Sequence, residues 1–238
     1  MLRCFSETEL QPITNQHQTR NNSGAHFRVR ISGELACFTR PEFSTERFSY
    51  ETITPSAARG ILEAILWKPG MRWEISRISV LNQVRWVEFR RNEVNQRVPT
   101  KAAGTAARKG KPLRDFYANE DRAQRNTVAL RDVDYLVEAR ILMTAKAGPE
   151  DNLVKFCEMF DRRLTKGQQV FQPYLGCREF PAKVVLAAEA PKPIQESRDL
   201  GWMLHDLEYG RERSPRFFRA QLKNGVIVVP EWKRAVRP

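Results

Sequence analysis

Two apolar helical patterns, each lying between segments of strand character, constrain the fold of this chain more than any other feature. The first runs along SAARGILEAILW, where apolar residues recur at helical spacing: Ala58, Ile61, Leu62, Ile65 and Leu66. Thr54 and Pro55 supply an N-cap and a first-turn proline, and Pro69-Gly70 ends the pattern. A helix that packs its apolar face on a sheet is therefore expected here.

The second helix is predicted from Glu150 to Lys166. It follows the chain break at Gly148-Pro149, and Gly167 provides its C-terminal stop. One side of this segment carries its apolar residues: Leu153, Phe156, Cys157, Phe160 and Leu164. This side is also expected to pack on a sheet.

Strand patterns surround both helices. Phe27, Val29 and Ile31 alternate with arginines, which predicts a first strand that continues to Phe38 with a bulge at Gly33. Further strand segments are expected at 73–80, 84–89, 133–145 and 182–190. With residues 82–131 set aside, the order is strand, helix, strand, strand, helix, strand. This order predicts an α+β protein with the ferredoxin-like βαββαβ frame, which RNA recognition modules share.

The chain divides into three parts on these patterns. Residues 1–26 are polar and lack periodicity, so we interpret them as a tail outside the fold. Residues 27–190 form the predicted RNA-recognition-like domain, with an insertion at 82–131. Residues 191–238 are expected to form a small C-terminal β domain of short strands.

The insertion at 82–131 concentrates positive charge. It holds twelve basic and five acidic residues, a net +7, within a chain whose net charge is +12. Its centre, PTKAAGTAARKGKP, offers no apolar run to bury, so we expect a projecting loop or hairpin. Such a segment can clamp a phosphate backbone by releasing counterions. The alternative is a solvated surface loop that happens to be basic.

Several classes of site find no support in the sequence. The four cysteines include no CxxC pair and there are only three histidines, which argues against a zinc site. No two-metal carboxylate cluster and no P-loop is evident, so neither a metal nor a cofactor is expected. The chain has no apolar run of membrane length and no apolar segment near its start, which predicts a cytoplasmic protein without a membrane partner.

Three motifs resemble one family. They are SGELACFTRPEFSTERFSYETITPSAARGILEAILWKP (32–69), RRNEV (90–94) and EDNLVKFCEMFDRRLTKGQQVFQPYLGCREFPA (150–182), followed further on by RDLGWMLHDLEY. Together they resemble the type I-C, or d-variant, branch of the CRISPR-associated Cas five family, from about Phe27 to near Pro230. The resemblance implies an RNA recognition frame with a small C-terminal β domain.

It also implies an activity. Family members cut the CRISPR precursor RNA in its repeat without metal, by attack of a ribose 2′-hydroxyl on the adjacent phosphate. They then hold the 5′ handle of the guide RNA within the Cascade effector. The implied partners are the guide RNA and its precursor repeat hairpin, the backbone and large subunits of Cascade, and target DNA through that complex.

The family's catalytic residues are a tyrosine in the first motif and a Lys-His pair in the third. The tyrosine corresponds to Tyr50 and the lysine to Lys155, but Phe156 occupies the histidine position. Tyr50 is a candidate base if a neighbouring cation, for which Arg47 is nearest in sequence, lowers its pKa. Lys155 would supply the stabilising charge. The acid role is then empty unless Lys155 acts twice or His205 takes part.

Each of these residues also has a structural interpretation. Tyr50 and His205 can simply pack, Lys155 can be a solvated charge, and Phe156 can belong to the core or stack an RNA base. Arg178 can contact RNA or pair with Glu179. The full set of predicted RNA contacts is Arg47, Arg90, Arg91, Arg108, Lys109, Lys111, Phe156, Arg162, Arg163 and Arg178.

Two alternative functions remain open from the sequence. The first is a non-catalytic subunit that caps the 5′ handle and nucleates assembly, because the family histidine is absent. The second is a general RNA-binding module without a CRISPR role.

Overall fold

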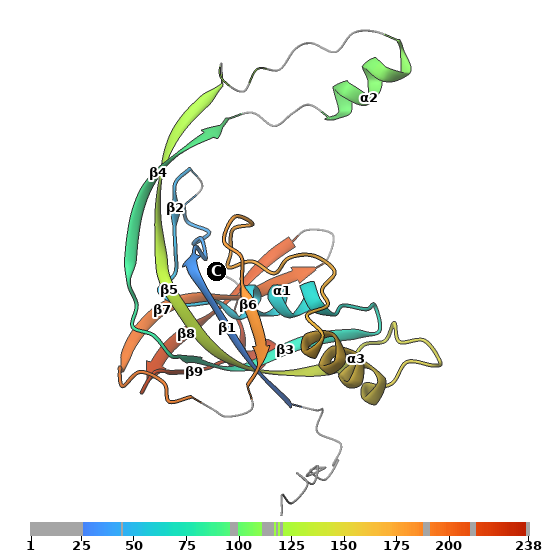
Figure 1. Ribbon diagram of the computed structural model, residues 1–238, viewed down its shortest axis with the longest axis vertical. Helices are drawn as coiled ribbons and strands as arrows, with labels where there is room; N and C mark the ends of the chain where they lie inside the picture. Colours follow the sequence, from blue (N-terminus) through green and yellow to red (C-terminus); the bar gives the residue numbers. More distant parts are fainter. Residues whose placement is uncertain are drawn as a thin grey trace, which may run out of the picture.

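The computed structural model describes residues 26–43, 45–95, 100–110, 117, 119, 121–187, 191–209 and 213–236. Within these ranges the elements are β1 (His26–Ala36), β2 (Arg47–Phe48), α1 (Pro55–Ile65), β3 (Met71–Val80), β4 (Trp86–Val94), α2 (Thr100–Arg108), β5 (Arg122–Met143), α3 (Leu153–Thr165), β6 (Lys183–Leu186), β7 (Arg198–Tyr209), β8 (Arg213–Lys223), β9 (Val226–Val228) and a 3-10 turn η1 (Trp232–Arg234). They form a mixed α/β fold in which a few helices accompany a curled, mainly antiparallel sheet (Figure 1). None of the described helices is long and apolar enough to cross a membrane.

One continuous sheet runs through the described chain in the order β6-β1-β5-β3-β9-β8-β7. Neighbours along this path are antiparallel, and β2 and β4 pair with β5 outside it. The expected C-terminal strands are present, but β7 and β8 are long, with 12 and 11 residues. They continue the main sheet because β9 pairs with β3, where Ile227 lies opposite Ile78.

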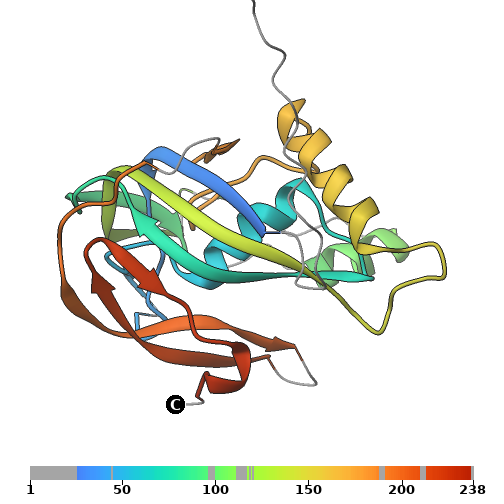
Figure 2. The same ribbon diagram turned by 90° about the horizontal axis from the view of Figure 1, so that it is seen from below.

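The sheet curls around α1. This helix contacts both β3 and β7, although β9 and β8 lie between those strands in the sheet. Figure 2 shows β7 and β8 turned out of the plane of β1 and β5. The curl lets one helix bury apolar residues against two separated parts of the sheet, and these residues of α1 are buried: Ala58, Ile61, Leu62, Ala64 and Ile65.

The start of α1 follows the sequence prediction. Thr54 has an extended backbone, and its hydroxyl accepts a hydrogen bond from the Ala57 N–H at 3.2 Å, while Pro55 occupies the first turn. The helix ends at Ile65, four residues before Pro69, because Leu66 turns to an extended conformation.

The second predicted helix is α3, and it is shorter than expected at its start. Asn152 caps it by accepting the Lys155 N–H at 2.8 Å, so residues 150–152 stay outside the helix. Gly167 follows with a φ of 64°, which confirms the predicted stop. Phe156 and Phe160 are the buried residues of this helix.

The basic insertion is a long hairpin. β4 pairs antiparallel with β5 from Trp86–Leu130 to Val94–Arg122, and α2 lies at the far end of this arm (Figure 1). The predicted hairpin is therefore confirmed. β5 begins at Arg122, eleven residues before the expected strand start at Val133, and α2 was not expected.

No bulge occurs at Gly33, where the sequence predicted one. β1 pairs with β5 through Gly33 without a shift of register. A Cβ at this position would lie 2.4 Å from Leu175 Cδ1 and 2.9 Å from the Pro181 carbonyl oxygen. The glycine is required because the loop before β6 packs directly on the strand.

Candidate functional site

Tyr50 lies on the wall of a cavity beside α1. Its N–H donates to the Phe38 carbonyl at 2.8 Å, and the preceding Ser49 N–H donates to Val128 at 3.0 Å, which fixes this segment between β1 and β5. The cavity has a volume of about 300 Å³. Its aromatic and hydroxyl-bearing lining includes Phe38, Thr39, Tyr50, Ser56, Phe171 and Tyr174.

The Tyr50 side chain is only 1% exposed, and its hydroxyl is buried. The hydroxyl makes no hydrogen bond of ordinary geometry with the described residues, although the Leu204 backbone lies close enough to interact with it. Burial raises the pKa of Tyr50 above its usual value. The neighbouring cation is Arg40, whose guanidinium lies 4.7 Å from the ring centroid. Tyr50 therefore keeps its proton at neutral pH, and it suits hydrogen-bond donation better than proton abstraction.

Arg47 does not serve Tyr50 in the expected way. Its Nε donates to Glu93 Oε1 at 3.2 Å, and its Nη1 donates to Cys177 Sγ at 3.2 Å. The predicted lowering of the Tyr50 pKa by Arg47 is therefore wrong. Arg47 instead ties β2 to the arm and to the loop before β6.

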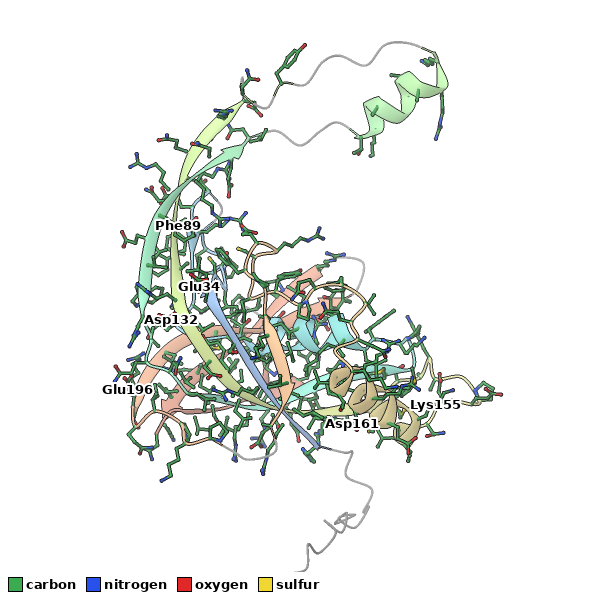
Figure 3. The ribbon with its side chains drawn as sticks, in the orientation of Figure 1. Glu34, Phe89, Asp132, Lys155, Asp161 and Glu196 are labelled. Carbon is green, nitrogen blue, oxygen red and sulfur yellow. The ribbon has the colours of Figure 1, made fainter. Side chains whose placement is uncertain are left out.

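Lys155 lies away from the Tyr50 cavity and does not line it. It occupies the first turns of α3, where its Nζ is 3.9 Å from Asp151 Oδ1 and its side chain is about half exposed. Figure 3 shows Lys155 on α3, with Phe89 of the arm on the other side of the molecule. Because Lys155 is not among the residues that line the Tyr50 cavity, the structure does not bring the two predicted catalytic residues into one cavity.

Phe156 belongs to the core. Its side chain is 1% exposed, and it is part of the main cluster of buried apolar residues. The predicted stacking of Phe156 on an RNA base is therefore corrected, because a ring without exposed surface cannot receive a base.

Exposed basic residues follow the arm. Arg90 on β4 and Arg108 and Lys109 at the end of α2 are exposed, while Lys111 lies outside the described residues. Arg91 is different because its side chain turns toward the protein. It forms an ion pair with Glu179 and donates from Nε to Thr127 Oγ1 at 3.2 Å.

Of the remaining predicted RNA contacts, one is bonded within the protein and two are exposed. Arg163 donates to the Ile65 carbonyl at 2.7 Å, so it caps the end of α1. Arg162 on α3 is exposed. Arg178 is also exposed, and its sequence neighbour Glu179 is the partner of Arg91.

Comparison with known proteins decides the family. The model of the Cas5d type, described as CRISPR-associated protein (Cas_Cas5), matches residues 27–230. This chain belongs to the Cas5d family.

Two curated relatives agree with this membership, and both are named CRISPR pre-crRNA endoribonuclease Cas5d. The protein from Mannheimia succiniciproducens is 48% identical over 212 residues, which are 85% of this chain and 94% of the relative. The protein from Thermus thermophilus is 40% identical over 228 residues, covering 88% and 93%. A crystal structure described as a CRISPR-associated protein shares the fold, with a TM-score of 0.66 at 24% identity over 89% of this chain and 95% of that one.

A thiol pair in this Cas5d chain escaped the sequence analysis. Cys37 and Cys177 are 140 positions apart, and both are buried. The pKa of Cys177 is lowered to about 6. The main cause is a hydrogen bond with the Cys37 thiol, and the positive charge of Arg47 acts in the same direction. This lowered pKa favours the thiolate form of Cys177 beside the Arg47 guanidinium. The only signal in the sequence was that both cysteines lie within the family motifs.

His205 packs rather than joining the Tyr50 cavity. Its Nε2 lies 2.8 Å from the Pro230 carbonyl, and its ring contacts Phe218 and Trp232 edge-on. Among the described residues, no group of three or more His, Cys, Asp or Glu side chains is arranged to hold a metal ion.

Proposed function

We propose that this chain is an endoribonuclease that cuts the precursor of CRISPR guide RNA and then holds the 5′ handle of the guide as a type I-C Cascade subunit. The observation that carries this proposal is the name shared by both relatives, pre-crRNA endoribonuclease, at 48% and 40% identity over most of the chain. The expected partners are repeat RNA, the backbone and large subunits of Cascade, and target DNA through the complex, in the cytoplasm.

We also propose that the finer fold is the ferredoxin-like frame. Four strands in the order β6-β1-β5-β3 with antiparallel neighbours support it, as does the placement of α1 between β1 and β3 along the chain and of α3 between β5 and β6. Residues 27–190 would form this domain with its arm, and 191–238 the C-terminal β part.

The reaction we propose is attack of a ribose 2′-hydroxyl on the adjacent phosphate, without metal. The O2′–P bond forms as the P–O5′ bond breaks, the 2′-hydroxyl proton passes to solvent, and the leaving 5′ oxygen is protonated. Tyr50, which keeps its proton, would donate a hydrogen bond or a proton to a phosphate or leaving oxygen. Lys155 would supply positive charge to the transition state. Phe156 takes no part because its phenyl ring can neither donate nor accept a proton.

A specific observation also favours the second candidate, a subunit that caps the handle without cutting. The Tyr50 hydroxyl is buried, and Lys155 does not line the same cavity. A chain arranged in this way binds RNA through its arm but lacks an assembled catalytic set.

One experiment separates the two candidates. The purified full chain is incubated in EDTA with repeat RNA from its own CRISPR array and with an unrelated hairpin. Cutting of the repeat alone, lost in Tyr50→Phe and Lys155→Ala but kept in Lys166→Ala at the other end of α3, supports the nuclease. Specific binding without cutting supports the cap, and the absence of any preference for the repeat contradicts both.

A further inference from the structure

The cavity beside Tyr50 has the chemistry of a site for an uncharged, planar group. None of the described residues that line it is charged, and three aromatic rings, from Phe38, Phe171 and Tyr174, contribute to its wall along with Tyr50. Its volume of about 300 Å³ is at the lower end of the range for small-molecule sites. The Arg40 guanidinium lies over the Tyr50 ring and is not itself part of the wall, whereas a flat heterocycle would find rings and hydroxyls in the wall.

We propose that this cavity receives one unstacked nucleobase of the bound RNA. The inference rests on the proposed function, and it adds a base-specific contact to the phosphate contacts of the arm. Proteins that read single-stranded RNA take bases out of the stack onto aromatic side chains and hydrogen-bond their edges.

The mouth of the cavity presents a ring for such stacking. Phe171 is 51% exposed, and its centroid lies 6.4 Å from that of Tyr174 with an angle of 37° between the rings. The same loop continues to Arg178, an exposed cation seven positions after Phe171.

Hydrogen-bonding groups line the cavity. The buried Tyr50 hydroxyl makes no hydrogen bond of ordinary geometry with the described residues, and its nearby group is the Leu204 backbone. The Thr39 and Ser56 hydroxyls also line the cavity. Ser56 donates to Asp206 Oδ1 at 3.2 Å and Thr39 Oγ1 lies 3.6 Å from Cys37 Sγ, so each oxygen keeps acceptor capacity for a base edge. A base edge with donors and acceptors can satisfy such groups, which an aliphatic ligand cannot do.

Gly60 keeps space open on the α1 side. It lies inside the helix, where glycine is less favourable than alanine, and it lines the cavity. A Cβ added here meets no atom within 4 Å. The fold therefore does not require glycine at this position, and a larger side chain at residue 60 would take up the open space that a base would occupy.

The test measures RNA binding after two kinds of change. One is a substitution that alters the cavity, and the other is removal of a single base from the RNA. The probes are the labelled repeat RNA and a set of the same RNA with a single abasic residue at each unpaired position. The variants are Gly60→Leu, which fills the cavity, and Phe171→Ala, which removes the ring. Val170→Ala is the matched control, because Val170 is 67% exposed, precedes Phe171 and does not line the cavity.

We expect one abasic position to weaken binding to the unaltered protein by about tenfold, the scale of one base–aromatic stack. Gly60→Leu and Phe171→Ala should weaken binding of intact RNA by a similar factor, with no further loss at that abasic position, and Val170→Ala should bind normally. The inference is overturned if no abasic position matters, or if the losses from protein and RNA multiply. A chain that does not prefer repeat RNA at all contradicts the proposed function, and this inference with it.

Discussion

Arg59 on α1 and Asp206 on β7 form a double hydrogen bond, with Nε 2.6 Å from Oδ2 and Nη2 3.0 Å from Oδ1. The pair fastens the helix to the last strand of the curled sheet. Both side chains are mostly buried, at 15% and 19% exposure. Removing one partner of such a pair leaves the other charge poorly solvated.

We therefore expect Arg59→Ala to lower the free energy of unfolding by about 3 kcal/mol. Chemical denaturation monitored by circular dichroism measures this change. The matched control is Arg219→Ala, which removes the pair with Asp199 on the same strand, where the side chains are 65% and 42% exposed. That variant should unfold at nearly the same denaturant concentration as the unaltered chain, because solvent screens the pair. Equal losses in the two variants would contradict the role given to Arg59.

Helix α1 could be predicted from the sequence, but the distant partners of its side chains could not. Local signals were sufficient for α1, because Thr54, Pro55 and the apolar spacing act within one turn or face of the helix. The partner of Arg59 is 147 positions away, and Cys37 and Cys177 are 140 apart. Such pairs follow from the curl of the sheet, which no local pattern encodes.

The arm was predicted in outline and missed in detail for a related reason. The first part of β5 is a polar strand that pairs with β4 away from the core, so it lacks the apolar alternation that identified residues 133–145. α2 has no buried apolar stripe among its described side chains, and its alanines were interpreted as loop. Tyr50 was identified by motif, but its burial depends on Phe38, Arg40 and Leu204 from other segments.

The Tyr50 hydroxyl provides a test that separates chemistry from folding. Because this buried group makes no hydrogen bond of ordinary geometry with the described residues, and has only the Leu204 backbone near it, Tyr50→Phe should change the free energy of unfolding by no more than about 1 kcal/mol. Loss of cutting in a variant of unaltered thermal stability would then reflect lost chemistry. A marked loss of stability would show instead that the hydroxyl is hydrogen-bonded within the folded protein.

Phe156 is expected to matter for stability and not for cutting. Phe156→Ala should cost about 3–5 kcal/mol, since it leaves a cavity in the core. Phe156→His should also destabilise the chain and should not increase cutting, because the imidazole would be buried where the phenyl ring now lies. Val154→Ala, an exposed position on the same helix, is the control and should change little. A gain of cutting in Phe156→His would contradict the assignment of this position to the core.

The lowered pKa of Cys177 predicts a pH dependence of stability. The pKa of Cys177 is lowered to about 6 in the folded chain, against about 8.5 for an unfolded cysteine. A lowered pKa adds stability that is fully present above the unfolded value and is lost as the pH falls through about 6. The free energy of unfolding should therefore rise between pH 6 and 8.5, by at most about 1.4 kcal/mol per unit for this one proton.

Two variants isolate this contribution. Cys177→Ser cannot form a thiolate, so its unfolding free energy should rise less steeply over the same range. Cys37→Ala removes the hydrogen bond that contributes most to the lowered pKa, and it should flatten the rise while Cys177 is kept. Identical pH profiles for all three proteins would show that Cys177 is protonated in the folded state.

The arm predicts how RNA binding responds to salt. Arg108 and Lys109 are exposed at the end of α2, whereas Arg91 is committed to Glu179 and Thr127 at the base of the arm. A cation that contacts phosphate displaces counterions, so each lost contact should reduce the slope of log affinity against log salt by about 0.7 to 0.9. Arg108→Ala and Lys109→Ala should each lower this slope and leave thermal stability unchanged.

Arg91→Ala should instead lower thermal stability, since it leaves Glu179 without its partner, and should keep the slope. Filter binding of repeat RNA from about 50 to 400 mM salt measures the slopes. An unchanged slope in the α2 variants would remove the arm tip from the RNA interface.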